Sequence, residues 1–145
     1  MIQLFTIGYT HKSAEKFFSL LAVNNIKNII DIRLNNSSQL AGFTKKKDLE
    51  YFLRNISEIN YFHLPFLAPT KEILNAYKKK EISWNEYEFQ FISLMKESKI
   101  EHKIDIEILQ NGCLLCSEEK ADKCHRRLVA EYLKNQFKDI IITHI

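Results

Sequence analysis

The fold is decided by the stretch Gly112-Cys113-Leu114-Leu115-Cys116-Ser117-Glu118, which is followed by Asp122-Lys123-Cys124-His125-Arg126-Arg127. A short apolar run that ends in polar residues predicts a buried strand whose last residues emerge from the sheet. Asp122 suits an N-cap, and apolar pairs recur behind it at helical spacing, so a helix is expected to follow. A helix N-terminus has free N–H groups and a partial positive charge, which attract anions and stabilise thiolates. The sequence therefore predicts a functional site at this strand-to-helix turn.

The length and composition are those of an ordinary globular protein. The 145 residues suit one domain, so residues 1–145 are expected to form a single unit with a real core. The chain shows no secretory signal and no apolar run near the roughly 20 residues that span a bilayer, which predicts a cytoplasmic protein without a membrane partner. Three cysteines are an odd count, so we expect reduced thiols. The net charge of +3 is compatible with a nucleic-acid partner but does not argue for one.

Outward from this stretch, strands alternate with helices. Further strands are expected at residues 2–7, 26–32, 60–64 and 140–145, and Ser13, Thr44, Thr70 and Ser83 are expected to cap helices. Residues 100–111 are compatible with a strand, an irregular connection or a short helix. The pattern predicts an α/β fold: a three-layer sandwich around a mostly parallel sheet of about four to five strands, with helices on both faces.

Polar side chains follow several of the predicted strands. In such sheets, ligands bind outside the carboxyl ends of the strands. The polar and glycine residues expected at that edge are Thr6, Gly8, Tyr9 and Thr10 after the first strand, Asp31 and Arg33 after the second, and Cys116 and Glu118 after the penultimate one. We expect them to meet there. Each also has a structural alternative: Asp31 and Arg33 as an ion pair, Gly8 as a turn residue, and Cys113 as a small core residue.

Three chemistries are compatible with these residues. Zinc would need Cys113 and Cys116 together with Cys124 and His125, but residues three apart in a strand point to opposite faces, so we predict no metal. In nucleophilic catalysis, a thiol beside the helix N-terminus would act with histidine and glutamate, and we pair Cys116 with His125 across the turn. Residues 117–125 hold no arginine, which disfavours a phosphate-loop phosphatase.

The third chemistry is binding without catalysis. Arg126 and Arg127 at a helix start oppose the helix dipole, and a carboxylate or a bound anion would relieve that cost. An anionic small molecule, a nucleotide or a nucleic-acid backbone could therefore lie on Arg33 and Arg126. Aromatic side chains could stack a base, although they are equally good core residues; they are Tyr9, Phe43, Tyr61 and Phe66. The lysine runs 45–47 and 78–80 are typical of solvated helix faces.

The motifs resemble, in order, the signature of the domain of unknown function 488 family. They are Thr6-Ile7-Gly8-Tyr9-Thr10, Asp31-Ile32-Arg33, Phe43, Leu115-Cys116-Ser117-Glu118, Cys124-His125-Arg126 and the closing His144-Ile145. The resemblance covers nearly the whole chain and implies a compact α/β fold. It implies a site at Thr6, Gly8, Asp31, Arg33, Cys116, Glu118, Cys124, His125 and Arg126. It implies no particular activity.

The chain departs from the family pattern in two places. The family commonly has Gly-His-Ser after the first strand, where this chain has Gly8-Tyr9-Thr10, and a base at position 9 is therefore absent. If the family uses that histidine, this member has shifted to His11 or lost activity. The family also commonly has a proline and a Ser-Arg pair after Asp-x-Arg, where this chain has Asn35-Asn36-Ser37-Ser38-Gln39.

The function expected from the sequence is an enzyme of unassigned reaction that acts on an anionic or nucleotide-like substrate and needs no cofactor. Its expected catalytic residues are Cys116, Glu118 and His125, and its substrate-binding residues are Thr6, Gly8, Tyr9, Asp31, Arg33, Cys124 and Arg126. The alternative is a non-catalytic nucleotide- or nucleic-acid-binding module.

Overall fold

The centre of the molecule is a five-stranded parallel sheet. The computed structural model describes residues 1–37 and 42–145, and its strands are β1 (Ile2–Gly8), β2 (Asn28–Asp31), β3 (Asn60–His63), β4 (Gly112–Cys116) and β5 (Ile140–His144). The strand order is β3-β2-β4-β1-β5, and every adjacent pair is parallel. All five predicted strands exist, each within two residues of its expected bounds. The α/β prediction is confirmed.

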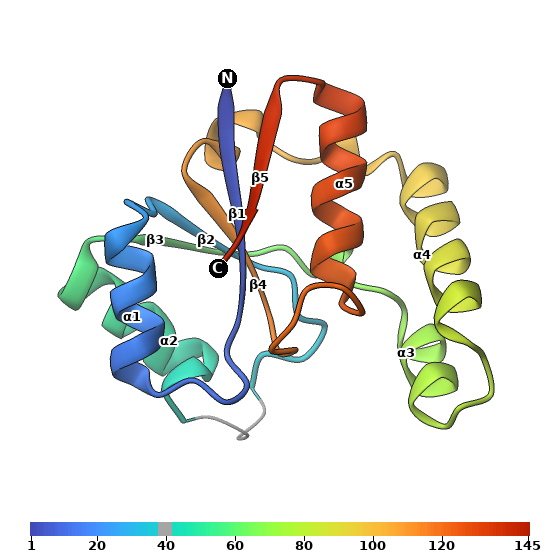
Figure 1. The fold of residues 1–145 in the computed structure, drawn as a ribbon, viewed down its shortest axis with the longest axis horizontal. Helices are drawn as coiled ribbons and strands as arrows, with labels where there is room; N and C mark the ends of the chain where they lie inside the picture. The colour runs from blue at the N-terminus through green and yellow to red at the C-terminus, as the bar shows by residue number, and fades with distance from the viewer. Residues whose placement is uncertain (38–41) are drawn as a thin grey trace.

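Helices cover both faces of the sheet (Figure 1). On one face lie α1 (Ala14–Val23) and α2 (Lys46–Phe52), and on the other α3 (Lys71–Lys78), α4 (Trp84–Ser98) and α5 (His125–Phe137). Alternate residues of β1 and β4 enter the two cores: Leu4 and Leu114 pack under α4 and α5, whereas Ile7 and Leu115 pack under α1 and α2. Within residues 1–37 and 42–145, no helix is long and apolar enough to cross a bilayer.

Three helix starts follow the predicted capping chemistry. Ser13 Oγ accepts from the backbone N–H of Lys16, Thr70 Oγ1 from Ile73, and Ser83 Oγ from Glu86. Each hydroxyl satisfies one of the N–H groups that a helix start leaves without a partner. These caps are therefore confirmed.

Two other predicted caps are wrong. Thr44 is buried in a short 3₁₀ turn, Gly42–Thr44, and α2 begins only at Lys46, after Lys45. Asp122 does not cap the last helix, because the chain continues in a turn and Cys124 takes the N-cap position. The Asp122 carbonyl instead accepts a hydrogen bond from Arg127 Nε.

The ambiguous segment 100–111 is neither a strand nor an α-helix. It contains two 3₁₀ turns, Ile100–His102 and Ile106–Leu109, whose buried residues Ile100 and Leu109 join the core beneath α4 and α5. Isoleucine alternates with charged residues in this segment, which is the pattern typical of a half-buried strand. Residues 38–41, which include Ser38 and Gln39 of the departure from the family pattern, lie outside the described residues.

The position of β4 brings the predicted motifs together. Gly8 is the register partner of Cys116, and Asp31 is the register partner of Leu115, because β4 lies between β1 and β2. The helices that follow β1 and β2 pack on one face, whereas α5, which follows β4, packs on the other. Such a reversal of connections at the carboxyl edge is where open α/β sheets bind ligands.

Candidate functional site

The predicted site residues form two clusters, one on each face of the sheet. Asp31 and Arg33 lie on the side of α1 and α2, together with Tyr9 and Tyr61. Cys116, Cys124 and His125 lie on the side of α5. The expectation that all of them meet in one pocket is therefore corrected: strand alternation sends Asp31 and Cys116 to opposite faces.

The backbone of Ile32 connects the two clusters. His125 Nε2–H donates to the Ile32 carbonyl at 2.8 Å, and Ile32 lies between Asp31 and Arg33 in the sequence. Because a carbonyl only accepts, the proton of the neutral imidazole is on Nε2, and Nδ1 is an acceptor. Nδ1 lies 3.4 Å from Cys116 Sγ. The same sulfur lies 3.9 Å from Nε2, so it sits beside the imidazole ring, close to both nitrogens.

The three cysteines differ in their environments. A hydrogen bond from Cys124 lowers the pKa of the Cys116 thiol, against the effect of burial, and the backbone N–H groups of Ser117 and Glu118 and the charge of Arg126 lower it further. The same contact with Cys116, together with burial, raises the pKa of Cys124. Burial also raises the pKa of Cys113, which packs under α1 and α2 as an ordinary core residue.

Arg126 is a buried cation whose partners are all neutral. Its side chain is fully enclosed, and it donates to the Thr6 hydroxyl at 3.2 Å, to the Glu119 carbonyl at 3.1 Å and to the Glu118 carbonyl. Among the described residues, no carboxylate forms an ion pair with it. Arg126 therefore joins β1 to the loop after β4 and places an unpaired positive charge near Cys116.

Asp31 and Arg33 form the ion pair that the sequence left as the structural alternative. Arg33 Nε and Nη2 donate to the two Asp31 oxygens at 2.9 and 2.8 Å, and Nη2 also donates to the Thr44 carbonyl. The guanidinium lies over the Tyr9 ring, 5.4 Å from its centroid. Arg127, by contrast, pairs near the surface with Glu131 and Glu88.

The site is almost closed. Cys116 is 4 % exposed and His125 7 %, whereas the Glu118 side chain is exposed to solvent. Two surface hollows lie elsewhere, one lined by Ser37 and residues 45–48 and the other by residues 50, 54 and 59–62. Neither is lined by the thiols. The thiol–imidazole cluster at the strand ends is therefore nearly closed to solvent.

Three of the four residues weighed for zinc do gather. Ligand atoms of Cys116, Cys124 and His125 lie within 4.8 Å of one another and could hold a thiophilic metal ion. Cys113 cannot join them because it faces the opposite core, as predicted from strand alternation. The cluster is thus chemically competent both as a metal ligand set and as a thiol–imidazole pair.

Sequence reasoning missed Tyr61 as a partner of Asp31 and missed Lys12 altogether. Tyr61 Oη donates to Asp31 Oδ2 at 2.5 Å, from a strand that pairs with β2. Lys12 Nζ donates to the Gly8 carbonyl at 2.7 Å. Burial, with the nearby charge of Arg126, lowers the pKa of Lys12. Knowledge of the strand order would have identified Tyr61 as a partner of Asp31, because β3 pairs with β2. The strand order cannot be read from the sequence.

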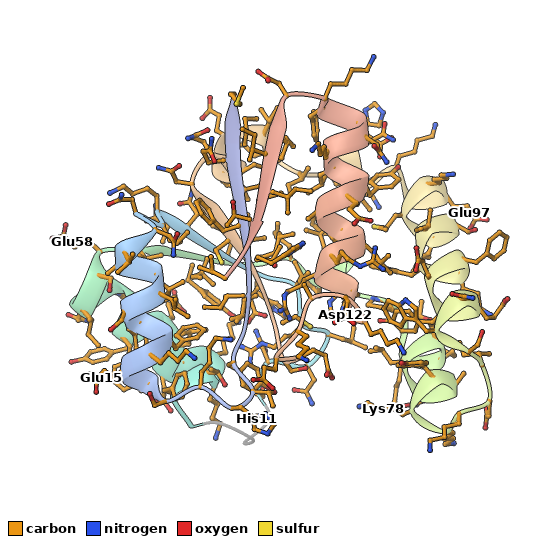
Figure 2. The ribbon with its side chains drawn as sticks, viewed as in Figure 1. His11, Glu15, Glu58, Lys78, Glu97 and Asp122 are labelled. Atoms are coloured by element: carbon orange, nitrogen blue, oxygen red, sulfur yellow. The ribbon has the colours of Figure 1, made fainter. Side chains whose placement is uncertain are left out.

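A scan against models of known families matches residues 13–133 to the domain of unknown function DUF488. The chain belongs to this family. No curated protein and no solved structure matches the chain. In this DUF488 member, Tyr9, where the resemblance implied a histidine, packs beneath Arg33. His11, the expected substitute, lies on the exposed loop after β1 (Figure 2). Its side chain contacts Glu119 at 2.9 Å rather than one of the thiols.

Proposed function

We propose that this DUF488 protein is a thiol-dependent enzyme in which Cys116 is the nucleophile and His125 accepts its proton. The observation that supports the proposal is the 3.4 Å contact between Cys116 Sγ and His125 Nδ1, with the imidazole fixed by the Ile32 carbonyl. A nucleophile, a base within reach and a third group that orients the base make up the arrangement used in covalent catalysis. Cytoplasmic reducing conditions would keep the thiols free.

The unpaired charge of Arg126 supports a thiolate at Cys116. A buried guanidinium without a counter-ion is costly, so a negative charge nearby is favoured. An ionised Cys116 supplies that charge in the resting protein. A small anionic or nucleotide-like electrophile would add negative charge at the same place, which is why we retain this substrate class. The low exposure of the thiol favours a substrate small enough to enter through the loop after β4.

Thiol reactivity tests the proposal without knowledge of the substrate. We expect iodoacetamide to label Cys116 with a pH midpoint below the roughly 8.5 of an ordinary thiol. His125→Gln should move that midpoint upward, because it removes the proton acceptor. The midpoint depends on ionisation rather than on access, and so burial cannot imitate the result. A midpoint at or above that of a small free thiol, or tightly bound stoichiometric metal, would overturn the proposal.

A thermal-shift screen of small metabolites would then identify the substrate class. Wild type and Cys116→Ser form the better pair for this screen, since Arg126 is enclosed and its removal would disturb the fold. A compound that stabilises both proteins binds without needing the thiol. A compound that stabilises only wild type engages the sulfur.

The second candidate is a nucleotide- or nucleic-acid-binding module. It is favoured by the hollow lined by Lys45, Lys46 and Lys47, which lies on the α2 side of the molecule. Binding through these lysines would weaken steeply with added salt and would be lost in a triple lysine-to-glutamine variant. The thiol chemistry of Cys116 would be unaffected by the same three changes.

A further inference from the structure

The two buried thiols of the cluster face each other across a short loop. Cys116 ends β4, Cys124 precedes α5, and residues 117–123 connect them. Their sulfur atoms lie within 4.8 Å of each other. A disulfide needs the sulfurs to approach to about 2.05 Å, with Cβ atoms about 3.5–4.5 Å apart. The two sulfurs must therefore move closer together, and rotation of the two side chains is the movement that we expect to achieve this.

The loop between the cysteines is held in place from both sides. Arg126 binds the carbonyls of Glu118 and Glu119, and the backbone N–H and hydroxyl of Thr10 both donate to the Ser117 carbonyl, at 3.0 and 2.6 Å. These bonds keep the end of β4 and the start of α5 at a constant separation. The framework of the loop therefore holds the two sulfurs within 4.8 Å of each other.

The pair is chemically asymmetric. Cys116 Sγ lies 3.4 Å from His125 Nδ1 and the pKa of its thiol is lowered, whereas contact with Cys116 and burial raise the pKa of Cys124. Thiol redox pairs divide their work in the same way, between a low-pKa attacking thiol and a neighbouring thiol that resolves the oxidised product. Cys113 has neither feature, because it packs in the opposite core.

We propose that Cys116 and Cys124 form a redox pair that a small hydroperoxide oxidises to a reversible disulfide. The inference rests on the proposed function, since it needs the reactive thiolate of Cys116. Burial of both thiols selects an oxidant as small as a peroxide.

The chemistry balances over two steps. The Cys116 thiolate attacks the outer peroxide oxygen, a sulfur–oxygen bond forms, the oxygen–oxygen bond breaks, and the leaving alkoxide or hydroxide takes a proton. The Cys124 sulfur then attacks the Cys116 sulfenic acid, the disulfide forms, and water leaves with the Cys124 proton. One peroxide is reduced to an alcohol or water, and two thiols are oxidised. An external dithiol such as dithiothreitol reverses the bond by exchange.

Tryptic mapping after hydrogen peroxide treatment tests the proposal. Cleavage at Lys103, Lys120, Lys123 and Arg126 places Cys116 on peptide 104–120 and Cys124 on peptide 124–126, so only a disulfide can join the two. We expect the joined peptides in wild type and in the control Cys113→Ser, in which peptide 104–120 holds one cysteine. We expect no joined peptides in Cys116→Ser or Cys124→Ser, and complete separation after dithiothreitol.

Labelling of Cys124→Ser with dimedone keeps the proposal testable if the disulfide yield is small. Cys124→Ser cannot resolve the first product, so we expect it to accumulate a Cys116 sulfenic acid that reacts with dimedone several-fold more than wild type does. Stable sulfenic or sulfinic acid at Cys116 in wild type, a bond through Cys113, or a bond between two chains would overturn the proposal. So would one zinc per chain that protects the thiols until a chelator removes it.

The outcomes separate this inference from the proposed function. If Cys116 reacts with iodoacetamide at low pH but never bonds to Cys124, only the redox pair is wrong. If Cys116 is inert to both reagents, both proposals are wrong.

Discussion

Gly8 shows how little room separates β1 from the loop after β4. A Cβ built on Gly8 would lie 1.6 Å from the Glu118 carbonyl oxygen and 2.8 Å from Arg126 Nη1. The requirement is therefore for space, and the positive φ weighed as an alternative for Gly8 is not found. A glycine here allows the loop that holds Cys116 and Cys124 to reach Arg126.

Gly8→Ala should destabilise the protein by roughly 1–3 kcal/mol or more, because backbone must shift to admit the methyl group. Urea unfolding measures the change. Gly42→Ala is the matched control, since a Cβ there meets no described heavy atom within 4 Å. Equal effects of the two changes would show that the close approach at Gly8 is not a constraint.

Asp31→Asn should cost about 3–5 kcal/mol of unfolding free energy. The substitution leaves Arg33 buried without its counter-charge, and an unpaired buried charge is far more costly than the pair itself. Glu131→Gln is the control, since it removes a surface partner of Arg127 and should cost less than about 1 kcal/mol. A loss below about 1 kcal/mol for Asp31→Asn would mean that water reaches the Arg33 guanidinium.

At the scale of elements, the helices differ in how firmly they are attached. Helix α5 buries seven residues, including His125 and Arg126. The structure describes every residue of α3, and none of them is buried. Figure 1 shows α3 and α4 on the outer side of α5. The site is thus built on the most firmly packed helix, as a constellation that must keep its geometry requires.

Hydrogen exchange should therefore be faster in α3 than in α5 by several orders of magnitude, because a helix with few buried contacts opens locally. Thr70→Ala removes the α3 cap and should accelerate exchange there, at a cost of about 1 kcal/mol, without changing the exchange of α5. The matched change Ser13→Ala removes the cap of α1, which buries Phe17 and Leu21, and should lower global stability instead. Equal protection of α3 and α5 would contradict the prediction.

At the scale of the whole molecule, the last strand, β5, forms an edge of the sheet and pairs with the first strand, β1. β5 pairs with β1 along its length, and the N–H of Ile145 donates to the Thr6 carbonyl. His144 Nδ1 hydrogen-bonds Thr6 Oγ1 at 2.6 Å, and this hydroxyl also accepts from Arg126. Burial, with the positive charge of Arg126, lowers the pKa of His144. The last strand is therefore coupled to the buried cation of the site.

Stability should fall as the pH drops below about 6.5, where the unfolded chain protonates His144 but the folded chain resists it. The unfolded state then binds more protons, so acid favours unfolding. His144→Asn should be less stable than wild type at pH 8, because the bond to Thr6 is weakened, and the gap should narrow toward pH 5. Urea titrations at both pH values measure the gap, and a gap independent of pH would contradict the prediction. A single cooperative transition would support the expected single domain.

Local patterns determined most of the elements. Apolar runs and capping hydroxyls such as Ser13 and Ser83 act over a few residues, so their effects can be read in order along the chain. The same locality explains the pairing of Cys116 with His125, which lie nine residues apart at the two ends of one turn. The wrong caps, Thr44 and Asp122, lie where Arg33 and Arg127 bind backbone carbonyls from other parts of the fold or turn.

Only the tertiary structure decided which polar residues share a face and how far they are buried. The insertion of β4 between β1 and β2 made neighbours of Gly8, Cys116 and Ile32, and strand alternation then sent Asp31 and Arg33 to the other side of the sheet. Strand order depends on long-range packing free energy, which is summed over contacts that no short stretch of sequence contains. The types of residue at the site were therefore legible in the chain, while their division into an ion pair and a thiol–imidazole cluster was not.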